Sequence, residues 1–410
     1  MKQRLFTRNF TLLLLGQVSS LVGNYTLKFA LSMYILERTG SAAVFAGILS
    51  AAMLPTILLS PLGGVLADRA NRRNIMVALD GLSGLAVLAA AAMLTQARGL
   101  PLVGALLVAL SILGAFESPT VLACVPQMLS GDNLLRGNAL VNQVNALAGL
   151  TTPFLGSVFY AAFGIRTVMR AAAICFFLTA LMECFIRLPH QRPAVRRRAT
   201  EIVREDVRAG VHFLLKEQPD ILRLLLLAAG VSFFVVGTAA VGFPFMIRNV
   251  LGLSASHYGL AESAMGAAAV LGGLAAGLLA KRIRTQRLYI MLVALGLCYL
   301  PAGISFLLPG GTLVRYVWLV LSFCGGQIAS SVFSIFALSA IQARTPPGLT
   351  GKVMACVSAL TLCAQPLGQA VYGVLFDAVG DAAHLVLLPT GAVLCIIACR
   401  SAGFFHRLRA

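Results

Sequence analysis

The stretch GGVLADRANRR, residues 63–73, changes within a few positions from apolar and glycine-rich to strongly cationic. It ends with Arg69, Arg72 and Arg73, and Asp68 is the single acid at the junction. Apolar segments long enough to cross a bilayer, which takes about 20 residues, lie on both sides of it. We interpret the stretch as a tight charged loop between two membrane-spanning helices.

The composition of the 410 residues fits a membrane protein. Hydrophobic residues make up 59% of the chain and charged residues 11%, whereas a soluble chain carries about 25% charged residues. The net charge of +18 comes from cations in short loops between apolar segments, which is the pattern of the positive-inside rule. This pattern leaves no basic surface for nucleic acid. The composition thus predicts an all-α polytopic membrane protein with no nucleic-acid partner.

Twelve apolar segments of membrane-spanning length follow one another. We expect helices at residues 10–36, 42–66, 75–96, 101–125, 138–163, 167–188, 221–248, 256–280, 288–308, 313–342, 353–376 and 383–404. The first is too long for the apolar core of a signal peptide and no small-residue cleavage site follows it, so we expect it to be retained.

One connection is longer than the others. Residues 189–220 are charged, and Val203, Val207 and Val211 recur there at helical spacing, which predicts an amphipathic helix on the membrane surface. The predicted domains are a six-helix bundle at 1–188, this linker at 189–220 and a second six-helix bundle at 221–410.

The distribution of Lys and Arg predicts the orientation. With the N-terminus inside, 25 of the 32 cations fall on inner segments and six on outer ones. Because positive charge favours the cytoplasmic side, we expect both termini in the cytoplasm.

The two halves repeat each other in sequence. GVLADR at 64–69 returns as GLLAKR at 277–282, LGSVFY at 155–160 as LGQAVY at 367–372, and VSSLVG at 18–23 more loosely as VSFFVVG at 231–237. The shift is 212 or 213 residues each time. Parallel repeats are a transporter architecture, with the substrate path between the halves. The repeat predicts two pseudo-symmetric six-helix bundles.

Residues 64–73 resemble the signature loop between the second and third helices of the major facilitator superfamily. Its pattern is a Gly, three residues, an acid, a base, any residue, a Gly and paired bases. Asn71 stands at the second glycine, and Asn tolerates the left-handed turn. GQVSSLVG, LERTGSA, GAFESPT and VPQML resemble the drug-efflux branch typified by bacterial macrolide efflux proteins. The resemblance implies the twelve-helix major facilitator fold and a secondary transporter that works by alternating access.

The resemblance further implies a latch that closes the cytoplasmic side when the transporter opens outward. Its members would be Gly64, Asp68, Arg69, Arg72 and Arg73, with Asp80 just inside the next helix as a further member. Asp68 would accept charge-assisted hydrogen bonds from the arginines or face a helix N-terminus. The alternative is that the cations only anchor the loop at the lipid headgroups. In the second half Lys281 replaces the acid, so we expect no matching latch there.

GLTTPFLG, residues 149–156, resembles the antiporter motif of the same family. Gly149, Pro153 and Gly156 carry the likeness, and Thr152 departs from it where a glycine usually precedes the proline. Pro153 is expected to bend the helix, and the small residues are expected to pack against the other half. The alternative is an ordinary bent helix.

Ionisable groups inside membrane segments are rare and usually functional. Lys28, Glu117 and Glu262 lie deepest, and we expect them either to couple transport to protons or to form structural ion pairs. The helical rise separates Lys28 from Glu117 by about 15 Å along the membrane normal, which predicts no direct pairing. Lys28 and Glu262 fall at equal depth in opposite halves. Glu183 is expected to pair with Arg187 one turn on.

Polar side chains at similar depths are candidates for the wall of a substrate cavity. They are Gln17, Asn24, Asn142, Asn145, Gln327, Gln365 and Gln369. With nearby aromatic residues they suit a large amphipathic substrate.

We therefore expect a proton-coupled exporter of drug-like or amphipathic small molecules in the bacterial cytoplasmic membrane. The alternative is an exporter or flippase of one metabolite, such as a siderophore or a lysolipid. No HExxH, GxSxG or GxxxxGK[ST] motif occurs, so we expect no enzyme activity. The nine cysteines form no CxxC pair and the five histidines lie in loops or near helix ends, so we expect no metal or cofactor. The expected partners are the substrate, protons and the lipid bilayer, and we expect a monomer.

Overall fold

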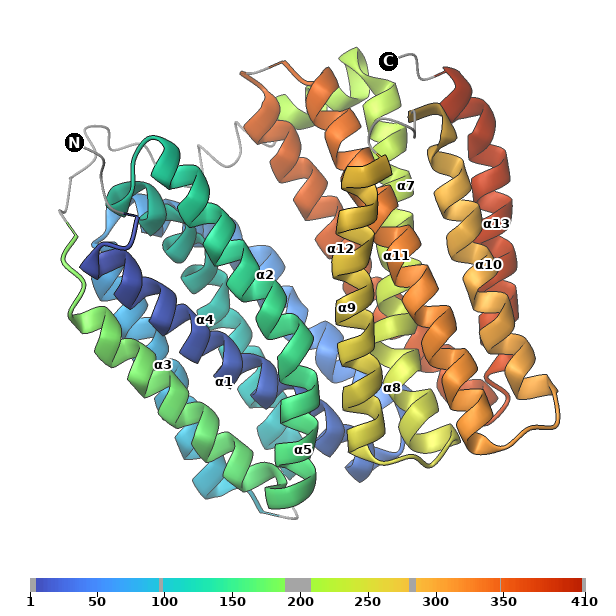
Figure 1. Cartoon of the computed structure of the whole chain (residues 1–410), viewed down its shortest axis with the longest axis horizontal. Coiled ribbons are helices and arrows are strands. Elements are labelled where there is room, and N and C mark those ends of the chain that lie inside the picture. Colours follow the sequence, from blue (N-terminus) through green and yellow to red (C-terminus); the bar gives the residue numbers. More distant parts are fainter. Residues whose placement is uncertain (1–4, 96–98, 189–207, 280–284, 347, 408–410) are drawn as a thin grey trace. The chain divides into compact units, whose positions relative to one another are not determined.

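The computed structural model describes residues 5–95, 99–188, 208–279, 285–346 and 348–407, apart from the side chains of Asp68, Asp132 and Thr285. Within these ranges every regular element is a helix (Figure 1). The long helices are α1 (Arg8–Thr39), α2 (Ala42–Arg69), α3 (Arg72–Met93), α4 (Gly99–Met128), α5 (Asp132–Cys184), α7 (Pro219–Gly237), α9 (Ala255–Leu279), α10 (Leu288–Leu307), α11 (Thr312–Arg344), α12 (Thr350–Val379) and α13 (His384–Arg407). The short ones are η1 (Phe213–Glu217), η2 (Thr238–Gly242), α8 (Phe243–Phe245), η3 (Met246–Val250) and η4 (Thr285–Arg287).

Eleven helical segments of the described chain are long and apolar enough to cross a membrane. One of them, α5, has 53 residues, which makes about 80 Å of helix and more than twice the ~30 Å hydrocarbon core of a bilayer. Gly164 interrupts α5 with φ 71° and ψ 174°, a backbone conformation that favours glycine. Because α5 supplies two crossings, the expected twelve-helix membrane fold is confirmed.

The chain divides into two compact units. The first comprises residues 1–39 and 51–201, and the second comprises residues 40–50 and 202–410. The first turns of α2 therefore group with the second half of the chain. The domain boundaries predicted from the sequence, which divide the chain only at the linker 189–220, do not include this exchange. The amphipathic helix expected within 189–220 lies largely outside the described residues, and its described part, 208–217, is helical.

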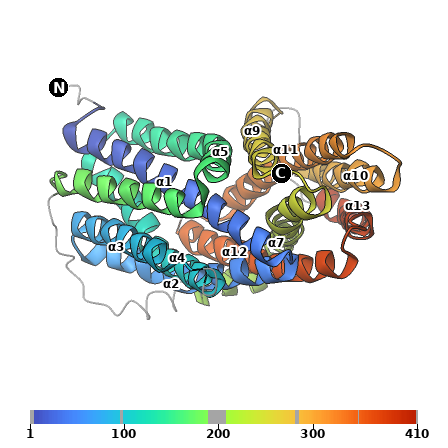
Figure 2. The same cartoon turned by 90° about the horizontal axis from the view of Figure 1, so that it is seen from below.

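In the first unit α1 packs along α5, and α3 packs along α4 and α5 (Figures 1 and 2). Gly23 allows the close approach of α1, because a Cβ there would lie 2.8 Å from the Cβ of Cys175. Ser19 donates to the Cys175 carbonyl at 2.9 Å, and Thr179 donates to the Gly16 carbonyl at 3.1 Å. Small residues and interhelical hydrogen bonds hold such seams, because lipid tails are as apolar as the side chains.

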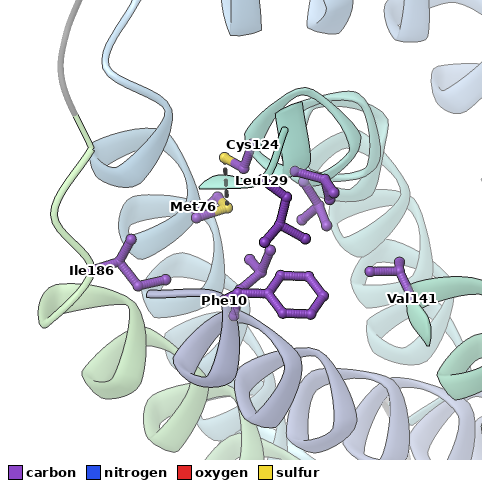
Figure 3. Close-up of a cluster of buried hydrophobic side chains, with 9 residues drawn as sticks. Phe10, Met76, Cys124, Leu129, Val141 and Ile186 are labelled. Carbon is purple, nitrogen blue, oxygen red and sulfur yellow. Dashed lines mark hydrogen bonds between the residues drawn. The ribbon is translucent and has the colours of Figure 1, made fainter. Parts of the chain in front are cut away.

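An apolar cluster closes one end of the first unit (Figure 3). It joins Phe10 on α1, Met76 on α3, Cys124 on α4 and Ile186 just beyond α5, all fully buried. The thiol of Cys124 lies 3.7 Å from the sulfur of Met76. The beginnings of α1 and α3 thus meet the ends of α4 and α5 here, beside the charged stretch at 63–73.

In the second unit α10 packs between α11 and α13, α7 packs along α12, and α9 packs along α11. Phe243 and Phe323 stack with their ring centroids 4.6 Å apart. The hydroxyl of Tyr299 lies 2.7 Å from that of Thr238, so the two buried hydroxyls satisfy each other.

Candidate functional site

A polar stripe runs along one face of α1. Gln17, Ser20, Asn24 and Lys28 follow one another at spacings of three and four residues, which places them on one side of the helix. Gln17 and Ser20 are buried, and Lys28 is exposed. The amide oxygen of Asn24 is buried without a hydrogen-bond partner among the described residues. The stripe faces acidic side chains of other helices.

Ser20 stands between two carboxyl groups. Its hydroxyl lies 3.2 Å from Oδ1 of Asp80 on α3 and 3.4 Å from Oε1 of Glu117 on α4. Asp80 is fully buried. A hydroxyl has a single proton, so Ser20 can donate to only one of these carboxyl groups at a time. The hydroxyl therefore links the two acids and can change partner between them.

Glu183 on α5 completes this carboxylate cluster, which we define as Asp80, Glu117 and Glu183. Glu183 is 1% exposed, and its carboxyl group interacts electrostatically with that of Asp80. Oδ2 of Asp80 and Oε2 of Glu183 are buried and have no partner within the described residues. Two carboxyl groups can form a hydrogen bond with each other only when one of them holds a proton. A proton on either acid would therefore let Asp80 and Glu183 bond to each other.

Lys28 interacts electrostatically with Glu117. An electrostatic interaction acts beyond contact distance and does not amount to a direct ion pair. The expectation that the two residues do not pair directly therefore stays a prediction.

The expected pairing of Glu183 with Arg187 was also wrong. α5 ends at Cys184, so Arg187 does not stand one helical turn above Glu183. Its backbone bonds instead to Asn9 of α1, accepting from the side-chain amide at 2.7 Å and donating to the side-chain oxygen at 3.2 Å. Glu183 remains with the other two acids of the cluster.

The carboxylate cluster lies one helical turn deeper than the apolar cluster of Figure 3. Asp80 follows Met76 by four residues, Glu117 precedes Val121 by four and Glu183 precedes Ile186 by three. The apolar side chains therefore separate the acids from the loops at that end of the unit. Access from the other direction passes the half-buried Glu117 and the exposed Lys28.

The carboxylate cluster has no counterpart in the second unit. A shift of 212 residues places Leu292 at the position of Asp80 and Cys395 at the position of Glu183. Both replacements are apolar or weakly polar. The duplicated bundles have thus diverged, and the acids belong to the first bundle alone.

The charged stretch at 63–73 covers the end of α2 and the start of α3, with only Ala70 and Asn71 between them, and it binds the ends of neighbouring helices. Arg72 donates to the carbonyls of Ala67 at 2.8 Å and Ala123 at 2.7 Å, and Arg73 donates to the carbonyl of Cys184. Cations stabilise the C-terminal ends of helices through the helix dipole. Both arginines therefore fasten α3 to the ends of α2, α4 and α5 inside the first unit.

The other members of the expected latch are only partly described. The side chain of Asp68 lies outside the described residues, so its role stays a prediction. Arg69 is exposed, and a Cβ added at Gly64 would meet open space. Asp80 lies two helical turns beyond Arg72, in the carboxylate cluster.

The antiporter-like segment lies inside α5. A Cβ at Gly156 would lie 3.3 Å from the Cα of Thr26 on α1, and Gly149 has open space around it. Gly156 therefore packs against a helix of its own unit, where the sequence had suggested the other half. α5 continues past Pro153, and its break comes at Gly164.

The second unit contains the remaining acid candidate. Glu262 on α9 hydrogen-bonds with Tyr258, one turn earlier on the same helix. Lys28 and Glu262 belong to different units, and their pairing stays a prediction.

The cavity candidates differ in their contacts. Asn145 bonds to the Val141 carbonyl and Gln327 to the Ser331 hydroxyl, each within its own helix. Asn142 is exposed and Gln365 half-buried. Gln369 is buried and accepts from the Ser50 hydroxyl at 3.5 Å.

Sequence reasoning missed a clip between the start of α2 and α12, which we define as Ser41, Ala42 and Asp377. Asp377 accepts from the Ala42 backbone nitrogen at 2.6 Å and from the Ser41 hydroxyl at 2.5 Å. A Cβ at Gly373 would overlap α2, so the backbones touch there. The sequence signal that could have predicted the clip is an acid, Asp377, near the end of one span together with a serine, Ser41, just before another.

Comparison with known proteins relates the chain to transporters. The sequence profile of the Major Facilitator Superfamily matches residues 13–368. The chain is 23% identical over 388 residues to macrolide efflux protein A of Streptococcus pyogenes, covering 93% of this chain and 92% of that protein. It is 26% identical over 411 residues to the multidrug efflux pump Tap of Mycolicibacterium fortuitum, covering 97% and 96%. It is 26% identical over 322 residues to the enterobactin exporter EntS of Citrobacter koseri, covering 76% and 71%.

Solved structures share the fold. A bacterial homologue of the iron transporter ferroportin, in an inward-facing state, matches with a TM-score of 0.73 and 16% identity, over 96% of this chain and 98% of that one. The nucleoside transporter NupG matches with a TM-score of 0.76 and 12% identity, over 96% and 99%. The fold and the likeness to the efflux branch, both expected from the sequence, are confirmed.

Proposed function

Because the chain belongs to the major facilitator superfamily, we propose that it is a proton-coupled exporter of drug-like or amphipathic small molecules. It would work by alternating access in the cytoplasmic membrane of a bacterium. The observation that carries this proposal is the carboxylate cluster of Asp80, Glu117 and Glu183, which has Lys28 beside it in the first unit.

The charges of the cluster support proton coupling. Three carboxyl groups and one ammonium leave an excess of negative charge when all are ionised, and uncompensated charge inside a membrane bundle is costly. A proton taken up by the cluster removes part of this cost and gives the Asp80–Glu183 pair its hydrogen bond. A positively charged substrate near Glu117 would also compensate the charge, so substrate and proton would compete.

Lys28 and Ser20 would connect substrate binding at Glu117 with protonation of the buried acids. Ser20 can donate to Asp80 or to Glu117, and the exposed Lys28 interacts electrostatically with Glu117. When Lys28 or a substrate cation occupies Glu117, the Ser20 hydroxyl is free to turn to Asp80. The two buried acids would thereby respond to events at the exposed edge of the cluster.

The efflux relatives support export as the direction of transport. Macrolide efflux protein A and the multidrug efflux pump Tap both match the chain over more than nine-tenths of their length. Large amphipathic compounds such as macrolides are therefore the first substrates to test. The surplus of inner cations in the sequence supports cytoplasmic termini.

A second candidate is the export of one siderophore. The similarity to the enterobactin exporter EntS favours it, over 76% of the chain. The two candidates differ in substrate range, since drug export predicts transport of several unrelated compounds and siderophore export predicts one.

The test uses everted membrane vesicles acidified inside by respiration. Addition of a transported macrolide should collapse part of the pH gradient with the wild-type protein, as an acridine dye reports. Glu117→Gln should reduce this signal at least about ten-fold. Glu217→Gln makes the same chemical change at an exposed position and should behave as wild type. Transport that proceeds equally well without a pH gradient would contradict proton coupling, and inward accumulation by intact cells would contradict export.

A further inference from the structure

The second unit contains a pocket of about 380 Å³ among α7, α10 and α13. Its wall is apolar and includes Leu226, Gly230 and Phe234 of α7, Leu292 of α10, and Leu394 and Phe404 of α13. Arg223 lies at one end, at the start of the second turn of α7. These residues belong neither to the carboxylate cluster nor to the clip.

The depth of the pocket matches one leaflet of a bilayer. From Arg223 to Phe234 the wall follows α7 for eleven residues, which corresponds to about 16 Å. The hydrocarbon core of a bilayer is about 30 Å thick, so the pocket extends about halfway across it. α13 lines it in the opposite direction, with Phe404 near the end of that helix and Leu394 deeper. An apolar chain that enters beside Arg223 would end near Phe234.

Arg223 is suited to hold a phosphate at the mouth of the pocket. Its side chain is 66% exposed and pairs with Asp220 at 3.4 Å. An exposed ion pair between neighbours on one helix contributes little, so it competes weakly with a phosphate. A guanidinium presents five N–H donors in a planar fork that fits phosphate oxygens. The exposed Leu226 continues the apolar wall from the arginine inward.

In the described part of the chain, the equivalent place in the first unit has neither the apolar wall nor the open space. Asp80 stands at the position of Leu292 under the 212-residue shift, and α1 meets α5 closely through Gly23 and Cys175. The second bundle therefore has an apolar space at the point of the repeat where the first bundle has buried acids. An apolar wall with a single cation at its rim complements a ligand with a long hydrocarbon chain and an anionic head.

We propose that this pocket binds one acyl chain of an anionic glycerophospholipid, with the lipid phosphate on Arg223. The proposal is independent of the transported substrate and of proton coupling.

Gly230 provides the sharpest test. A Cβ built there meets nothing within 4 Å, so Gly230→Leu adds a side chain at the pocket wall with open space at its Cβ, and it favours the helix. Gly273→Leu on α9 is the matched control, because that glycine also has open space but lies outside the pocket. Arg223→Gln removes the cation, with the exposed Arg136→Gln of the first unit as its control.

The measurement is native mass spectrometry of the full-length protein, delipidated and then titrated with phosphatidylglycerol or phosphatidylcholine carrying the same acyl chains. The wild type should retain one phosphatidylglycerol more tightly than phosphatidylcholine. Gly230→Leu should weaken that binding at least about ten-fold for both lipids. Arg223→Gln should weaken phosphatidylglycerol alone, by about five-fold. The two controls should bind as the wild type does.

Two results would overturn the proposal. One is equal phosphatidylglycerol binding by the wild type and Gly230→Leu when both variants keep the same thermal stability. The other is tight binding of glycerophosphate without acyl chains, which would assign the affinity to the arginine alone. If Gly230→Leu fails to fold, Gly230→Val in the same titration decides between the outcomes.

Discussion

Asp377, near the end of α12, accepts a hydrogen bond from the backbone nitrogen of Ala42 at 2.6 Å. Ala42 is the first residue of α2, and its nitrogen is one of the four that a helix leaves unpaired at its start. Asp377 therefore acts in place of a capping residue, and its negative charge favours the positive end of the helix dipole. The clip fastens the beginning of α2 to the second unit.

The rest of α2 belongs to the first unit, which begins again at Ala51. Pro55 follows four residues later inside the helix. A proline removes the hydrogen bond to the residue four positions before it, and here that residue is Ala51. α2 is thus weakened where it passes from one unit to the other, which suits a helix that must bend when a transporter changes state.

Asp377→Asn should loosen the clip. The amide keeps an acceptor but loses the charge, which should cost about 1 kcal/mol of capping energy. Hydrogen exchange of the backbone amides at 42–50 should therefore accelerate about five-fold. Asp381→Asn changes an exposed acid four residues away and should leave exchange unchanged. Equal protection of 42–50 in both variants would show that Asp377 does not hold α2.

Lys28 and Glu117 should depend on each other. Their electrostatic interaction predicts that Lys28→Ala and Glu117→Gln are non-additive in substrate affinity, with a coupling energy of about 0.5–3 kcal/mol. The same cycle between Lys28 and Glu262 tests the pairing across the halves that equal depth suggested. Additivity in the first cycle would show that Lys28 does not act on Glu117. Additivity in the second would leave Glu262 as a local partner of Tyr258.

Two variants of the charged stretch at 63–73 should affect stability and transport differently. Arg72→Gln removes charge-assisted bonds to two carbonyls and should lower the free energy of unfolding by about 1–3 kcal/mol, measured as a loss of thermal stability. Asp68→Asn should strongly reduce transport while the protein stays folded in the membrane. If Asp68→Asn transports normally, only the headgroup-anchor interpretation of the loop remains.

Two exposed loop glycines can test the orientation. Gly310 and Gly348 both have open space around them, so a cysteine at either position is expected to be tolerated in a cysteine-free background. With cytoplasmic termini, Gly310→Cys should react with an impermeant thiol reagent on intact cells and Gly348→Cys should not. The reverse labelling pattern would show that the termini lie outside and that the predicted orientation is wrong.

The sequence predicted the elements of the fold better than the details of the site. Apolar length and loop charge identified twelve spans, because the bilayer fixes how much apolar chain each crossing needs. Depth along a span follows from the same count, and it brought Lys28 and Glu117 forward as candidates. Depth does not say which way a side chain points, so Asp80 was assigned to the loop beside it and not to the carboxylate cluster.

Other features of the site depend on contacts between distant parts of the chain. The place of Glu183 follows from the end of α5 at Cys184 and from its packing on α1 at Gly16. No local pattern contains this information. One signal could have been used, because Gln17, Ser20, Asn24 and Lys28 stand at helical spacing and predict a polar face on α1.

The central claim is that substrate and proton compete for the carboxylate cluster. The most direct test is to add a transported macrolide to the purified protein in weakly buffered detergent solution and to follow the pH with an indicator dye. We predict that the wild type releases protons on binding, and that Glu117→Gln binds with little or no release. The measurement is repeated at pH values from about 5 to about 9, a range that covers the pKa values expected for buried carboxyl groups. The account would be contradicted if the wild type bound the macrolide without releasing protons at any of these pH values.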